Sequence, residues 1–114
     1  MHTGSCHCGA VQFKVEGEID RALECNCSHC SRKGFLLWFA PKSAFEITQG
    51  ADKLPTYTFN KHAIQHQFCA TCGCQAFGFG KSPDGAEMAA VNLRCLEGFD
   101  VDSVERVPVN GRDF

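Results

Sequence analysis

Hydrophobic and polar positions alternate over short stretches of this chain, and this pattern predicts strands rather than helices. In residues 11–16, Val11, Phe13 and Val15 share one face and polar side chains take the other. A period of two is typical of a strand that is buried on one side only. Gly17 ends this stretch, so the first predicted strand covers residues 11–16.

Further short apolar stretches predict the rest of a mainly β domain. Residues 35–40 are continuously apolar and bounded by Gly34 and Pro41, which indicates a buried strand. Pro55 favours an edge position for the strand that contains it. The other predicted strands are 22–24, 45–47, 54–59, 63–68, 75–79 and 88–93.

Helical signals are weak throughout the sequence. Residues 28–33 predict a turn or a single helical turn that stops at Gly34, and no stretch predicts a helix of ten residues. The tail from residue 97 carries little signal beyond a turn at residues 110–111, with Phe114 expected to pack on the core. We therefore expect one small domain over residues 1–114, made of short antiparallel strands.

Length and composition allow such a domain but leave its stability marginal. The chain has 114 residues, 44% hydrophobic and 21% charged, which is ordinary for a globular protein. Many short strands around a modest core bury little apolar surface, so an additional cross-link is expected. A structural metal would provide it, because the free energy of metal binding is also free energy of folding.

Charge and hydropathy exclude two classes of partner. Thirteen acidic residues against eleven Lys and Arg give a net charge of −2, whereas a nucleic-acid binder should show a basic excess. The chain start lacks the basic and apolar regions of a signal peptide, and the longest apolar run has six residues, too few to span a bilayer. We expect a cytoplasmic protein with neither nucleic-acid nor membrane partners.

Nine cysteines are a high count for this length, and their spacing favours metal binding over disulfides. The count is odd and the cysteines lie in tight clusters. Cys-x-Cys pairs are too close in sequence to form relaxed disulfides. Clustered thiolates on a turn can instead converge on one Zn²⁺ ion.

The densest cluster is Cys25, Cys27 and Cys30, which lie within six residues. Three protein ligands leave one position of a tetrahedral zinc ion open, as in catalytic sites. We therefore predict a catalytic zinc site at these three residues. A fourth ligand from elsewhere in the chain would make the site structural instead. His29 lies between two of the ligands and is expected to point away from the metal.

Four other cysteines predict a second, closed zinc site. Cys69 and Cys72 have the spacing of a zinc knuckle and are followed by Gly73, and Cys6 and Cys8 provide a matching half some sixty residues earlier. Cross-linking such distant segments restricts the unfolded chain strongly in the simple loop-closure model. The alternative is that Cys69 and Cys72 are a redox pair.

Cys74 and Cys95 are left over by this division. A free cysteine is most often a small buried hydrophobic residue, and this is the expected role of both. Cys95 is also a candidate nucleophile. Arg94-Cys95 faintly resembles the Arg-Cys near the C-terminus of sulfoxide reductases with a related zinc fold, which gives a third, weaker functional hypothesis.

The motifs together resemble the glutathione-dependent formaldehyde-activating enzyme family, which also includes centromere protein V. The resemblance extends over nearly the whole chain. It is carried by residues 4–11 (GSCHCGAV), 25–34 (CNCSHCSRKG), 68–73 (FCATCG), 90–96 (AVNLRCL) and 110–114 (NGRDF).

The resemblance implies a zinc-stabilised β-tent fold with two zinc ions, one structural and one catalytic. It implies that Cys6, Cys8, Cys69 and Cys72 bind the structural zinc and that Cys25, Cys27 and Cys30 bind the catalytic zinc. It also implies a carbon–sulfur lyase that adds glutathione to formaldehyde. The family motif fixes the metal sites better than the substrate, so the expected substrates are a glutathione-like thiol and formaldehyde or another small aldehyde.

Three further expectations concern the surroundings of the catalytic site. Asn26, Ser28 and nearby backbone N–H groups are candidates for hydrogen bonds to the ligands. Arg32 and Lys33 could bind a substrate carboxylate, and Arg is better suited because its donors form a fork. Trp38 is expected in the core. The alternative to an enzyme is a non-catalytic, zinc-stabilised binding module of the same fold.

Overall fold

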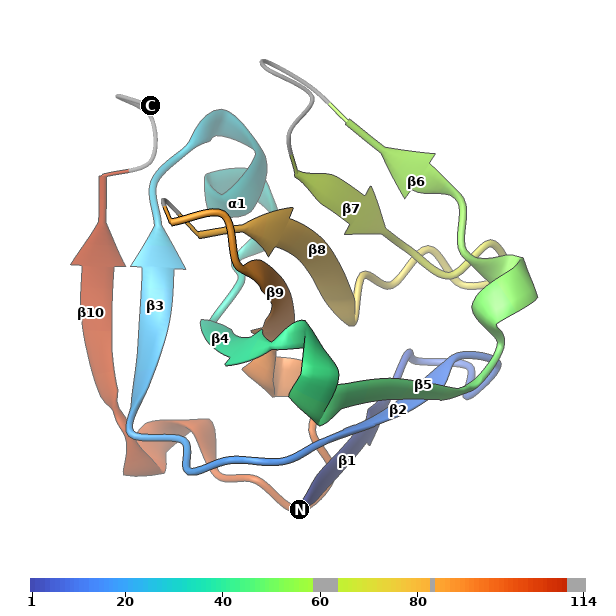
Figure 1. The fold of residues 1–114 in the computed structure, drawn as a ribbon, viewed down its shortest axis with the longest axis horizontal. Helices are drawn as coiled ribbons and strands as arrows, with labels where there is room; N and C mark the ends of the chain where they lie inside the picture. The colour runs from blue at the N-terminus through green and yellow to red at the C-terminus, as the bar shows by residue number, and fades with distance from the viewer. Residues whose placement is uncertain (59–63, 83, 111–114) are drawn as a thin grey trace.

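The computed structural model describes residues 1–58, 64–82 and 84–110, and within these ranges the chain is mainly β (Figure 1). The strands in chain order are β1 (His2–Ser5), β2 (Gln12–Val15), β3 (Arg21–Cys25), β4 (Leu37–Pro41), β5 (Phe45–Gln49), β6 (Thr56–Tyr57), β7 (Gln65–Gln67), β8 (Phe77–Lys81), β9 (Glu87–Asn92) and β10 (Glu105–Val109).

The strands form two sheets. One has three strands in the order β1-β2-β5, and the other has seven in the order β10-β3-β4-β9-β8-β7-β6. Strand β6 ends the larger sheet, as Pro55 predicted. In Figure 1 the small sheet crosses below the large one, and β10 and β3 form the opposite edge from β6 and β7.

The expectation of antiparallel strands alone is wrong at one edge of the large sheet. Strand β10 pairs with β3 in parallel over five residues, from Glu105 opposite Arg21 to Val109 opposite Cys25. The sequence does not predict β10, because Glu105, Arg106 and Pro108 leave only Val107 and Val109 as an alternating apolar pair. An edge strand tolerates such residues, since one side of it has no ladder to complete.

The helical segments are short. Helix α1 (Ser28–Lys33) ends at Gly34, whose φ of 68° terminates it in the left-handed conformation, as expected. The 3-10 turns are η1 (Lys42–Ala44), η2 (Ala51–Lys53), η3 (Leu93–Cys95) and η4 (Val101–Ser103). The predictions for Phe59, Ala63, Gly111 and Phe114 lie outside the described residues.

The apolar stretch at residues 35–40 does not form the fully buried strand that was predicted. Phe35 and Leu36 are buried but precede β4, and within β4 only Trp38 and Ala40 face the core. Phe39 is 46% exposed. The reason is that this antiparallel part of the sheet is covered on one face only, so alternate side chains face outward.

The core joins the two sheets through aromatic rings. Phe13 of β2 stacks on Phe45 of β5 with centroids 5.2 Å apart and meets Phe77 of β8 edge-on at 5.5 Å. Phe13 and Phe77 are both 1% exposed. Trp38 lies in the same buried cluster, as expected. Because these rings are large, their burial contributes much of the packing energy of a domain this small.

Among the described residues, no helix is long and apolar enough to cross a membrane.

Gly50 fixes the approach of the loop after β5 to the turn that carries Cys8. Its φ is 86°, and a Cβ there would collide with the carbonyl oxygen of Ala10. Gly98 has a φ of 69° but open space around it. We expect Gly50→Ala to lower the free energy of unfolding by about 3 kcal/mol, from backbone strain and overpacking together.

The matched control is Gly98→Ala, which should cost only the backbone term of about 1 kcal/mol. Urea unfolding of both variants measures the difference. Equal losses in the two proteins would show that the contact with Ala10 does not constrain the fold.

Candidate metal centres

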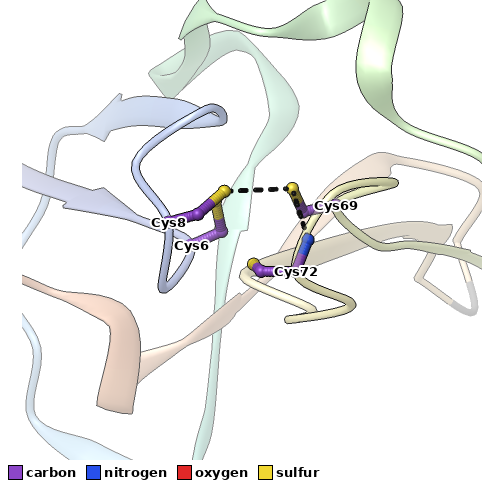
Figure 2. Close-up of side chains that lie close together, drawn as sticks. All are labelled: Cys6, Cys8, Cys69 and Cys72. Carbon is purple, nitrogen blue, oxygen red and sulfur yellow. Dashed lines mark hydrogen bonds between the residues drawn. The ribbon is translucent and has the colours of Figure 1, made fainter.

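Two pairs of cysteines from distant parts of the chain meet at the junction of the sheets. Cys6 and Cys8 lie in the turn after β1, and Cys69 and Cys72 lie in the turn after β7 (Figure 2). The four sulfur atoms all lie within 4.8 Å of one another. The Sγ atoms of Cys6 and Cys8, and those of Cys8 and Cys69, are 3.7 Å apart.

These distances fit a tetrahedral zinc ion. A Zn–S bond of about 2.3 Å places the corners of a ZnS₄ tetrahedron about 3.8 Å apart. The donor set, four thiols without oxygen or nitrogen ligands, is also the one that structural zinc uses. Cys6 and Cys69 are buried, Cys72 is half-buried and Cys8 is exposed.

Backbone N–H groups point at the sulfurs of this cluster. Those of Thr71 and Cys72 donate to the Sγ of Cys69 at 3.4 and 3.5 Å, and that of Val11 donates to Cys6 at 3.4 Å. Backbone donation, chiefly from Cys74 and then Cys8, lowers the pKa of the Cys72 thiol to about 6. The turn of Cys69 and Cys72 therefore favours thiolates, the form that binds metal. At Cys8 the N–H of Ala10 lowers the pKa, but desolvation and the neighbouring thiols outweigh it and raise the pKa to about 11.

The three remaining predicted ligands form the second cluster. Cys25 is the last residue of β3, Cys27 precedes α1 and Cys30 lies inside that helix. Their sulfur atoms lie within 4.8 Å of one another, and in the described part of the chain no fourth His, Cys, Asp or Glu joins this group. His29 is not a member of it.

The start of α1 favours a thiolate at Cys27. Burial raises the pKa of this thiol. The hydrogen bonds that its sulfur receives from the N–H of Cys30, at 3.2 Å, from the N–H of His29 and from the neighbouring thiols have the opposite, larger effect. The net pKa is lowered. Burial raises the pKa of Cys30. A cation placed among the three sulfurs would offset that burial, so the cluster also fits zinc.

An open hollow of about 360 Å³ is lined by Ser28, His29, Arg32 and Tyr57, and none of the three cysteines lines it. We refer to it as the α1 hollow. The imidazole of His29 stacks on the ring of Tyr57 with centroids 5.7 Å apart. Arg32 is exposed, and its Nη1 donates to the carbonyl of Ser28 at 2.8 Å. The hollow thus combines an aromatic wall with a guanidinium group.

A polar network that includes the buried residues His66 and Gln75 contacts α1. His66 of β7 lies 4.1 Å from His29 between ring centroids, and its Nδ1 is 3.3 Å from Nε2 of Gln75. Nζ of Lys33 donates to Oε1 of Gln75 at 3.1 Å. Burial lowers the pKa of His66 to about 4, so its ring is neutral at pH 7.

Sequence reasoning missed this network. Tyr57 lies opposite His66 because β6 pairs with β7 in the register that places Thr56 beside Gln67. Two strands of two and three residues give too little pattern to fix a register. Gln75 precedes β8, and nothing in its sequence context indicates contact with helix α1.

The other predicted residues do not belong to either group of cysteines. Asn26 is directed at β10 and donates from Nδ2 to Oδ1 of Asn110 at 2.8 Å. Lys33 is bound to Gln75, so the two basic residues of α1 differ in their partners. Cys95 is half-buried, and its sulfur lies 3.7 Å from that of Cys74.

Comparison with known proteins places this arrangement in a family. The model of the glutathione-dependent formaldehyde-activating enzyme family matches residues 1–106. The chain belongs to this family. It is also similar to a Rhodobacter sphaeroides protein whose crystal structure has been determined, with 33% sequence identity and a TM-score of 0.79. The match covers 92% of this chain and 99% of that one.

Removing one ligand of the four-cysteine cluster should unfold the domain. We expect Cys69→Ser to lose bound zinc and to lower the free energy of unfolding by about 4 kcal/mol or more, because metal binding and folding are coupled. Zinc per chain and thermal unfolding are the measurements. Cys74→Ser, two residues beyond the last ligand, is the control and should keep the zinc and the melting temperature of the unmodified protein. Equal zinc content in both variants would contradict a metal at this cluster.

Proposed function

We propose that this protein adds a thiol to a small aldehyde at the cluster of Cys25, Cys27 and Cys30, with one zinc ion there and a second, structural one at the four-cysteine cluster. The observation that carries the proposal is a group of three sulfurs that no fourth ligand joins among the described residues, at a helix whose Ser28, His29 and Arg32 line an open hollow. A purely structural zinc is normally closed by four protein ligands. Family membership supports the same class of reaction.

The reaction itself is a simple addition. The thiol sulfur forms a bond to the carbonyl carbon, the C=O π pair moves to oxygen, and the thiol proton ends on that oxygen, so that R–SH and CH₂O give R–S–CH₂–OH. A zinc ion bound by the three sulfurs would supply a Lewis-acidic coordination position. Glutathione and formaldehyde are the substrates that we propose.

Residues of α1 would bind and orient the thiol. The bond from Arg32 to the carbonyl of Ser28 limits the motion of the guanidinium and leaves further N–H donors for a carboxylate. Holding one end of the thiol beside the three sulfurs raises the effective concentration of the reacting group. The stacked rings of His29 and Tyr57 form an aromatic wall that limits the orientations of a bound thiol.

Lys33 is assigned no part in substrate binding. Its ammonium group is bound to Gln75 at 3.1 Å and lies over the ring of Phe35, 5.7 Å from the centroid. It is not among the residues that line the α1 hollow. Arg32 is therefore the basic residue of α1 that we expect a substrate carboxylate to meet.

The proposed reaction can be tested by exchange NMR on a mixture of glutathione and formaldehyde. The zinc-loaded protein should exchange free and hydroxymethylated glutathione faster than the uncatalysed mixture does. Cys27→Ala should return the rate to the uncatalysed value, because the ligand set is then broken. Cys74→Ser should keep the full rate.

If the unmodified protein gives no acceleration, this pair of substrates is excluded. Bound zinc at the three-cysteine cluster without acceleration for any of a panel of thiols and aldehydes would instead favour the binding-module alternative.

The role proposed for Arg32 gives a separate prediction. Arg32→Ala should raise the KM for glutathione on the order of tenfold, the loss expected for a charge-assisted hydrogen bond, and change kcat little. Lys33→Met is the matched control and should leave KM unchanged. A thiol without a carboxylate, such as 2-mercaptoethanol, should not distinguish Arg32→Ala from the unmodified protein. Equal effects of the two substitutions would contradict the assignment.

A further inference from the structure

Two cysteines that belong to neither cluster lie in contact. The Sγ atoms of Cys74 and Cys95 are 3.7 Å apart, although the residues are 21 positions apart in sequence. Both side chains are half-buried, so small solutes can reach them. Among the described residues, no further His, Cys, Asp or Glu joins this pair as a possible ligand group of three. Two thiols cannot complete the tetrahedron of a zinc ion, so both remain available for other chemistry.

The two segments that carry these thiols can bring them closer. Cys74 follows Gly73, whose φ is 78°, at the end of the turn that holds Cys69 and Cys72. Cys95 is the last residue of η3, just before the bridge between Leu96 and Gly4. Neither residue lies inside a strand, so side-chain rotation and small turn adjustments can bring the sulfurs to the bond distance of about 2.05 Å.

We propose that Cys74 and Cys95 are a site of reversible oxidation, at which a hydroperoxide converts the two thiols into a disulfide. One thiol attacks the O–O bond and becomes a sulfenic acid, with loss of one water molecule in the case of hydrogen peroxide. The second thiol then attacks that sulfur and releases a second water molecule. In sum, two R–SH and H₂O₂ give R–S–S–R and two H₂O, and a thiol reductant reverses the change.

The position of the bond suggests what it does. Cys74 lies two residues beyond Cys72, and its carbonyl accepts a hydrogen bond from the N–H of Cys69 at 3.0 Å. A disulfide between Cys74 and Cys95 would link the turn that carries Cys69 and Cys72 to the segment around Leu96. Leu96 pairs with Gly4 of β1, the strand that is followed by Cys6 and Cys8. The oxidised protein should therefore release zinc from the four-cysteine cluster more slowly to a chelator.

Peptide mapping of the oxidised protein tests the proposal. The zinc-loaded protein is treated with hydrogen peroxide at low molar excess, and its zinc content is measured. It is then denatured in the presence of N-ethylmaleimide, which alkylates free thiols, and digested with trypsin. Cleavage places Cys74 in the peptide of residues 62–81 and Cys95 in the peptide of residues 95–106. We expect these peptides to be joined through Cys74 and Cys95, with zinc content unchanged and Cys69 and Cys72 alkylated.

Variants separate this bond from non-specific oxidation. Cys74→Ser and Cys95→Ser should each abolish the joined peptide while keeping the zinc content and the melting temperature of the reduced protein. With a chelator, oxidation should slow zinc release several-fold in the unmodified protein and not in Cys95→Ser. A disulfide bond that involves Cys69 or Cys72, located by fragmenting the joined peptide in the mass spectrometer and accompanied by release of zinc, would overturn the proposal. So would complete alkylation of Cys74 and Cys95 after peroxide treatment.

Discussion

The convergence of four sulfurs from two segments some sixty residues apart is the constraint on which the rest of the structure depends. Cys6 and Cys8 follow the first strand of the small sheet, and Cys69 and Cys72 follow a short strand near the edge of the large one. The rings of Phe13, Phe45 and Phe77 pack directly between the same two sheets. A single junction therefore holds both sheets, and a metal bound there would add to the limited burial of a small core.

Helix α1 concentrates much of the candidate chemistry in one and a half turns. Cys30 lies in the helix and Cys27 directly precedes it. Arg32 lines the α1 hollow, and Lys33 donates a hydrogen bond to Gln75. An isolated helix of six residues would not be stable in water. Its conformation must come from Gly34 at its end, from the buried Cys30 and from the contacts with His66 and Gln75 beneath it.

Local signals determined how much of this could be predicted. The period of two at residues 11–16 and the turn at 28–33 act within a few residues, and they form β2 and α1. The spacings within each cysteine motif are equally local, and the sulfurs of the two predicted groups lie together. The missed features depend on pairing between distant segments. Strand β10 is identified only by its partner β3, Phe39 is exposed because nothing covers that face, and the contact of Cys74 with Cys95 requires the closed fold.

The parallel pairing of β10 with β3 bears on the order in which the protein is assembled. Val109 lies opposite Cys25, its carbonyl accepts from the N–H of Asn26, and Asn110 accepts from the side chain of Asn26. The four-cysteine junction needs only the chain up to residue 72. The strand that carries Cys25 gains its neighbour β10 only when residues 105–109 are present. On a ribosome the four-cysteine junction can form early, while the three-cysteine cluster acquires its final surroundings only after residue 110 has emerged.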